Sequence, residues 1–114
     1  MKYYKAPLEV LKRRYFLKDE RGDIVEDFSM MMQRVARAVA QADAYFGATE
    51  KEIKCIEEKF FNLLSSLKFL PNSPTLMNAG TKNGQLAACF VLPLKDSLKD
   101  IFQTLKETAL IHQS

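Results

Sequence analysis

The chain has 114 residues, of which 47% are hydrophobic and 27% are charged, and it contains 4 Gly and 4 Pro. This is the composition of one folded domain or of a piece of a larger one, which excludes a disordered or collagen-like chain. The formal net charge of +3 is concentrated in residues 1–15, and no apolar run reaches the ~18 residues of a membrane-spanning helix, so we expect neither DNA nor a membrane as a partner.

The first amphipathic helix is predicted from Asp27 to about Phe46, after a polar turn segment. Asp27 is a suitable N-cap, because its carboxylate can accept hydrogen bonds from free N–H groups of the first turn, and Gly47 provides a stop. We expect the methionine run at 30–32 to pack in the core. The apolar positions recur at helical spacing: Phe28, Met31, Met32, Val35, Val39, Ala42 and Phe46.

A second helix is predicted to begin after Thr49, whose hydroxyl can form a capping box with Glu52. Because only Gly47 and Ala48 separate the two helices, we expect an antiparallel pair whose apolar stripes bury each other. The stripe of the second helix consists of Ile53, Ile56, Phe60, Leu63, Leu64 and Leu67.

Residues 71–84 have no helical period and are rich in Pro, Gly and Asn, so a long ordered loop or a series of turns is predicted there. Gly80 would allow the backbone to approach a ligand closely. The polar side chains of this segment suit a phosphate ligand, but they are also the ordinary residues of turns, and both interpretations stay open. They are Ser73, Thr75, Asn78 and Thr81.

The run at 85–92, QLAACFVL, is apolar almost throughout and predicts a strand buried on both faces. Cys89 in this strand is either a core cysteine or a redox thiol that faces a pocket. Cys55 lies among charged residues and is expected to have no role. The N-terminus lacks a signal peptide's apolar segment, so we expect a cytoplasmic protein with both cysteines reduced, and the spacing predicts no metal site.

The last predicted helix begins near Asp96 and Ser97 and reaches Ser114 without a stop signal. These two side chains most simply cap the helix, although a helix N-terminus can also hold the hydroxyls or phosphates of a nucleotide. His112 has no partners for catalysis or metal binding near it in the sequence. Because one strand cannot form a sheet and the helix has no stop, we expect the chain to be a piece of a longer protein.

The segment LKFLPNSPTLMNAGTKNGQLAACFVLPLKDSLKDIFQTLKETALIHQS resembles the start of the catalytic barrel of ribonucleotide reductase large chains. Its ACFVLP form is most similar to the adenosylcobalamin-dependent class, and YFLKDERGDIVE resembles the N-terminal helical region of the same family. The resemblance implies a mainly α chain, with a helical region over 1–70. Over 71–114 it implies the first strand and helix of the ten-stranded α/β reductase barrel.

The resemblance also implies site residues. Cys89 matches one of the two cysteines that reduce the ribose 2′ position, and Ser73 matches a loop residue that contacts the substrate. Ala88 stands where many members have serine, so only its backbone can contact the substrate. Asp96 and Ser97 match an effector-binding pair on a helix that helps to form a homodimer.

The implied reaction is thiyl-radical reduction of ribonucleoside di- or triphosphates, which supplies DNA precursors. The implied cofactor is adenosylcobalamin, or alternatively a radical from a separate di-iron subunit. Implied partners are deoxynucleotide and ATP effectors and a thioredoxin- or glutaredoxin-type reductant. The family's N-terminal nucleotide-binding cone, which gives overall-activity control, is not recognisable in this sequence. These 114 residues alone are expected to be inactive. The competing hypotheses are a stand-alone helical interaction module and a nucleotide-binding regulatory fragment without catalysis.

Overall fold

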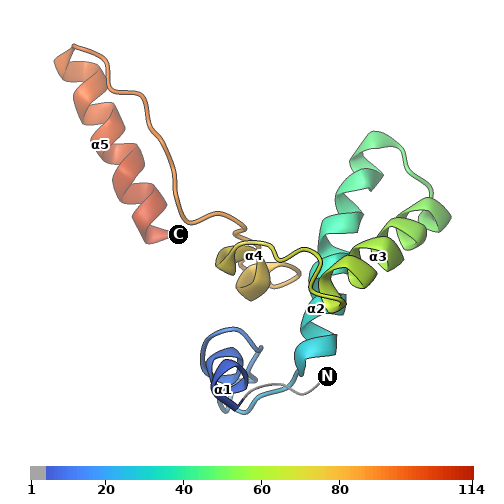
Figure 1. Cartoon of the computed structure of the whole chain (residues 1–114). Helices are drawn as coiled ribbons and strands as arrows, with labels where there is room; N and C mark the ends of the chain where they lie inside the picture. Colours follow the sequence, from blue (N-terminus) through green and yellow to red (C-terminus); the bar gives the residue numbers. More distant parts are fainter. Residues whose placement is uncertain (1–4) are drawn as a thin grey trace.

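The computed structural model describes residues 5–114, so Lys2 of the positive N-terminal stretch lies outside the described residues. Helices α1 to α4 gather in one body, and an extended segment leads from this body to α5 (Figure 1). No strand forms among residues 5–114. The elements are α1 (Lys5–Arg14), α2 (Phe28–Ala40), the 3-10 helix η1 (Gln41–Phe46), α3 (Glu50–Ser65), α4 (Ser73–Asn78) and α5 (Leu98–Gln113).

The N-terminus of α2 confirms the predicted cap, because the Asp27 side chain accepts a hydrogen bond from the backbone N–H of Met30 at 2.9 Å. The predicted stop is also confirmed, since Gly47 adopts the left-handed conformation at φ 87°. The helix changes to the tighter η1 after Ala40. No residue of η1 is buried, and Phe46 is 87% exposed.

The capping box of α3 is present in both directions. The Thr49 hydroxyl accepts from the backbone N–H of Glu52, and a Glu52 carboxylate oxygen accepts from the backbone N–H of Thr49 at 2.8 Å. This backbone hydrogen bond, with a second one from the Thr49 hydroxyl, lowers the pKa of Glu52 below its ordinary value of 4.5. The helix ends at Ser65, before the predicted Leu67, which lies in the left-handed region at φ 55°.

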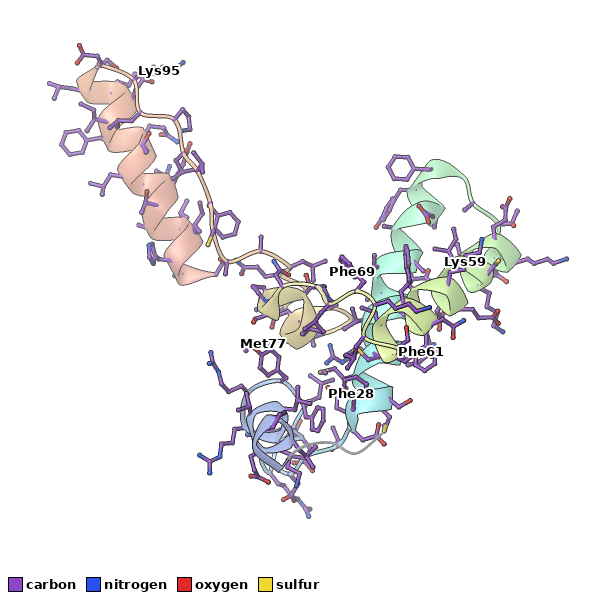
Figure 2. All side chains as sticks on the ribbon, in the orientation of Figure 1. Phe28, Lys59, Phe61, Phe69, Met77 and Lys95 are labelled. Carbon is purple, nitrogen blue, oxygen red and sulfur yellow. The ribbon has the colours of Figure 1, made fainter. Side chains whose placement is uncertain are left out.

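The core forms where α3 packs back across α2, and the two helices form the antiparallel pair that was predicted. Phe28 and Phe61, labelled in Figure 2, pack at its edge. Met31 and Met32 are fully buried, whereas Met30 is 53% exposed, so two of the three methionines confirm the prediction. The buried members of the core are Phe16, Met31, Met32, Val35, Ala36, Leu64, Leu76 and Ala79.

Helix α1 was not predicted, because the basic residues of its sequence conceal a short apolar stripe. Leu8, Leu11 and Tyr15 recur at spacings of three and four residues and pack against the core. They are followed by the polar turn segment, where Lys18 and Ile24 form an isolated antiparallel bridge. The N-terminal positive charge is therefore carried in part by a helix of the domain.

The predicted loop over 71–84 is wrong in part, because it contains the short helix α4. Asn72 is its N-cap and accepts from the backbone N–H of Thr75 at 3.2 Å, and Pro74 stands in the first turn, where its missing N–H is harmless. Asn and Pro favour turns and helix starts alike, so composition alone did not separate the two.

The prediction of a buried strand at 85–92 is also wrong for the residues described. The segment is extended but makes no ladder, because none of residues 5–114 offers it a parallel or antiparallel strand. Phe90 is 49% exposed and its neighbour Val91 is 98% exposed, and successive side chains of an extended segment point to opposite faces, so neither face is covered. The segment ends at α5, where Ser97 is the N-cap, and no residue of α5 is buried.

Among the described residues, no helix has both the length and the apolar character that a bilayer crossing requires.

Candidate active site

An open cavity of ≈ 930 Å³ lies where the end of α1, helix α4, the extended segment and the last turns of α5 meet. Three of the predicted site residues line it together: Ser73, Ala88 and Cys89. Met77, labelled in Figure 2, lines the cavity from α4. The full lining consists of Arg14, Ser73, Pro74, Met77, Asn78, Gln85, Ala87, Ala88, Cys89, Phe90, Leu92, Thr108, Ile111 and His112.

Ser73 is the first residue of α4, and its side chain is at the cavity wall. The hydroxyl oxygen lies 2.8 Å from the phenolic oxygen of Tyr15, which follows α1 by one residue. This contact joins two segments that are 58 residues apart in the sequence. The start of α4 is therefore fixed to the end of α1 beside the cavity.

The extended segment is tied to α4 just before it reaches Cys89. The Asn78 side-chain amide donates to the carbonyl of Gln85 at 2.9 Å, and the Asn72 amide donates to the carbonyl of Leu86 at 3.3 Å. The hydroxyl of Thr75 donates to the same Leu86 carbonyl at 3.3 Å. Cys89 follows three residues later and is a free, exposed thiol on the cavity wall.

These contacts distinguish among the polar residues of the 71–84 segment. Thr75 and Asn78 hold the chain itself, and Thr81 closes a turn by donating to the carbonyl of Asn78 at 2.7 Å. Their positions support the structural interpretation for these three side chains. Ser73 differs from them, because its side-chain hydrogen bond among the described residues joins it to another side-chain hydroxyl and not to the backbone. Ser73 also lines the cavity, as Asn78 does.

Arg34 of α2 holds the C-terminal end of α4 in place, and no sequence pattern predicted this role. Its guanidinium donates to the carbonyls of Leu76 at 3.0 Å and Ala79 at 2.7 Å, which lie near the C-terminal end of α4. It also makes a two-point ion pair with Glu26, at 2.7 and 3.0 Å. Both side chains are largely buried, at 12% and 5% exposed. No sequence signal separated Arg34 from the exposed Arg37 one turn later.

Gly80 has a structural explanation in the same contact. Its φ is 73°, and a Cβ atom added there would lie 3.1 Å from the Cγ atom of Arg34. The absence of a side chain at Gly80 therefore allows a close approach to α2, while its approach to a ligand stays a prediction.

The structure does not bring Asp96 and Ser97 to the cavity. They lie at the opposite end of α5, next to Lys95, which Figure 2 labels at the far end of the extended segment. Since α5 has 16 residues, its two ends are about 24 Å apart. The Ser97 hydroxyl accepts from the backbone N–H of Asp100 at 3.1 Å and donates to its carboxylate at 2.6 Å, so its capping role is confirmed.

His112 and Cys55 lie in different parts of the structure. His112 lines the cavity from the last turn of α5, whereas Cys55 is an exposed free thiol on α3, outside that cavity. No three His, Cys, Asp or Glu side chains within residues 5–114 are grouped so that they could hold a metal ion.

The comparison with protein families decides between the competing hypotheses. The model of the family "Ribonucleotide reductase, all-alpha domain" matches residues 1–84, which include helices α1 to α4. This chain belongs to the ribonucleotide reductase family. That membership favours the reductase hypothesis over a stand-alone helical interaction module.

Individual ribonucleotide reductases match beyond residue 84. The vitamin B12-dependent ribonucleoside-diphosphate reductase of Mycobacterium tuberculosis is 47% identical over 110 residues, covering 96% of this chain and 16% of that protein. The enzyme of the same name from Thermoplasma acidophilum is 38% identical and covers 94% of this chain and 21% of its own length. The ribonucleoside-diphosphate reductase large subunit of Danio rerio is 39% identical, covering 93% and 12%. The chain thus spans about a fifth or less of these relatives.

Proposed function

We propose that this chain forms the N-terminal helical region and the first part of the catalytic site of a ribonucleoside-diphosphate reductase. The observation that carries the proposal is the presence of Ser73 and Cys89 on one cavity in a chain of this family. We assign residues 1–70 to the helical region and 71–114 to the start of the barrel. In this proposal the 85–92 segment becomes a strand when further strands of the barrel pair with it.

The proposed reaction replaces the 2′ hydroxyl of a ribonucleotide by hydrogen. A thiyl radical removes the 3′ hydrogen and later returns it, and the 2′ hydroxyl leaves as water. The two electrons and two protons come from a dithiol, consisting of Cys89 and a cysteine outside the described residues, which ends as a disulfide. A thioredoxin- or glutaredoxin-type dithiol then reduces this disulfide by thiol exchange.

The other assigned residues bind rather than react. The Ser73 hydroxyl and the Ala88 backbone contact the substrate, and both already border the cavity. Asp96 and Ser97 contribute to a separate effector site for deoxynucleotides or ATP, which agrees with their distance from the cavity. Helix α5 contributes to a homodimer contact, which would cover the apolar side chains that it exposes.

Adenosylcobalamin is the proposed cofactor. The chain is 47% identical to the vitamin B12-dependent reductase of Mycobacterium tuberculosis, which is higher than its 39% identity to the large subunit from Danio rerio. When bound, it supplies the radical that generates the thiyl. The described residues do not themselves form its site: His112 is the only imidazole, and it is exposed at the end of α5. We therefore assign its binding to other parts of the protein.

The proposal is tested by assaying deoxynucleotide formation from ribonucleoside diphosphates, with adenosylcobalamin and a dithiol. The assay uses the complete gene product that contains these residues. Cys89→Ser is expected to lower the rate by at least ~10³-fold, because serine cannot supply the electrons of the dithiol. Cys55→Ser is the matched control, since Cys55 is also a free exposed thiol but lies outside the cavity, and it should retain the wild-type rate.

Retained activity in Cys89→Ser would contradict the assigned role of this thiol. A wild-type protein that binds deoxynucleotides but forms no product, with binding unaffected by Cys89→Ser, would instead support the regulatory fragment. The isolated 114-residue chain is expected to be inactive in the same assay, because it holds only one thiol of the proposed pair on the cavity.

A further inference from the structure

Tyr15 lies behind Ser73 as seen from the cavity. Its ring is half-buried and packs against the core, so it is held by the helical body rather than by the cavity wall. Its phenolic oxygen is 2.8 Å from the Ser73 hydroxyl oxygen, and Tyr15 is not itself part of the cavity lining. The contact therefore connects a fixed residue to an exposed one that faces a ligand-sized space.

The chemistry of the pair favours a particular direction of hydrogen bonding. A phenol, with a pKa of ~10, is a stronger acid than an aliphatic hydroxyl, so we take Tyr15 as the donor and Ser73 as the acceptor. Ser73 then keeps its own hydrogen for a second partner. Hydrogen-bond chains polarise their members, so a serine that accepts from a phenol is a better donor.

The charge of the surroundings indicates which second partner this would be. Arg14, the residue next to Tyr15, lines the same cavity and makes no ion pair among the described residues. A guanidinium and a serine O–H on one wall are a donor pair suited to an anionic oxygen such as that of a phosphate.

We propose that Tyr15 is a positioning residue, which orients the Ser73 hydroxyl toward a phosphate oxygen of a ribonucleoside diphosphate in the cavity. The inference rests on the proposed function for the identity of the ligand. It makes the end of α1 responsible for the geometry of a substrate contact on α4.

The test is Tyr15→Phe in the complete gene product, which keeps the packed ring and removes only the hydroxyl. We expect the KM for a ribonucleoside diphosphate to rise about 3- to 10-fold, the range of one neutral hydrogen bond, with kcat changed less than about 2-fold. Tyr45→Phe is the matched control, because Tyr45 is 92% exposed on η1 and should leave KM unchanged. The melting temperature of Tyr15→Phe should stay close to that of the wild type.

A double variant separates positioning from a merely structural role. In a Ser73→Ala background, Tyr15→Phe should cause no further rise in KM, because the group through which it acts is gone. An unchanged KM in Tyr15→Phe, or an equal rise with and without Ser73, would overturn the inference. If Tyr15→Phe unfolds, Ser73→Ala alone must still raise KM, and an unchanged KM there overturns the inference as well.

Failure of the proposed function would appear differently. If the wild type forms no deoxynucleotide, binding of CDP is measured by calorimetry instead of KM. A weaker CDP affinity in Tyr15→Phe, absent in the Ser73→Ala background, would support the positioning role although the reductase proposal had failed. A wild type that binds no CDP would overturn both.

Discussion

Arg34 determines the position of α4 through charge and hydrogen bonds together. Replacing it with methionine keeps much of the side-chain volume but leaves Glu26 buried without its cation and two α4 carbonyl bonds unmade. A buried carboxylate that loses its partner destabilises a protein strongly, so we expect Arg34→Met to lower the free energy of unfolding by about 3–5 kcal/mol. Urea denaturation followed by circular dichroism measures this difference.

Arg37→Met is the control for that variant. Arg37 is 68% exposed and lies 3.4 Å from Glu57, which also keeps a hydrogen bond from Gln33. Because Arg37 is exposed and the buried Glu57 keeps the hydrogen bond from Gln33, loss of this pair should cost at most about 1 kcal/mol, and the control should unfold close to the wild type. Equal losses in Arg34→Met and Arg37→Met would contradict the importance given to the buried pair.

The residues that could be predicted from sequence are those whose partners are near in the chain. The caps at Asp27, Thr49 and Ser97 each bond to a backbone N–H three residues later, so a local pattern was sufficient. Arg34 bonds to carbonyls that are 42 and 45 residues away. The residues next to Arg34 in the sequence do not indicate these distant partners. The cavity was predicted in part, since Ser73 and Cys89 meet there, while Tyr15 was missed for the same reason as Arg34.

At the level of elements, the junction between α4 and α2 depends on a glycine. In Gly80→Ala, the new Cβ would meet the Arg34 side chain at 3.1 Å, in addition to the strain of a left-handed alanine at φ 73°. In Gly84→Ala the φ is 59° but the nearest atom is 3.8 Å away. Thermal denaturation should show a loss of about 1–2 kcal/mol for Gly84→Ala and a larger loss for Gly80→Ala. A smaller loss at Gly80 would mean that Arg34 moves aside freely.

Elements were predicted correctly where each could bury its own stripe nearby. The α2 and α3 helices satisfy this condition through their short link, and both were found from periodicity. The 85–92 segment does not, because a strand exists only with a hydrogen-bonded neighbour, and the described residues contain none. Burial of this segment therefore stays a prediction for a protein that supplies further strands.

At the scale of the whole molecule, the buried residues of the described part of the chain all lie before residue 80, and residues 80–114 contain none. The radius of gyration is 18.0 Å, against about 13 Å for a compact domain of this length, because the extended segment and α5 reach away from the body (Figure 1). All members of the core cluster lie between Phe16 and Ala79. Beyond it, Val91, Leu94 and Leu98 are each at least 71% exposed.

This division predicts the behaviour of a shortened chain that ends at Ala88. It keeps the core and the carbonyls that Asn72 and Asn78 hold, so its melting temperature should match that of the 114-residue chain. It loses the exposed apolar residues of α5, so it should bind less of the dye ANS and scatter less light at the same concentration. A shortened chain that no longer unfolds cooperatively would show that α5 supports the core.

The position of the core cluster also has a consequence for synthesis on the ribosome. The chain emerges from its N-terminus, and the last core residue, Ala79, precedes the exposed apolar side chains of residues 86–110. Domains fold as units while translation continues, so the helical body can close before that segment appears. The side chains of Asn72, Thr75 and Asn78 would then already have their final positions. They would form hydrogen bonds to the carbonyls of Gln85 and Leu86 as soon as these residues leave the ribosome. This shortens the time in which the nascent apolar chain is free to aggregate.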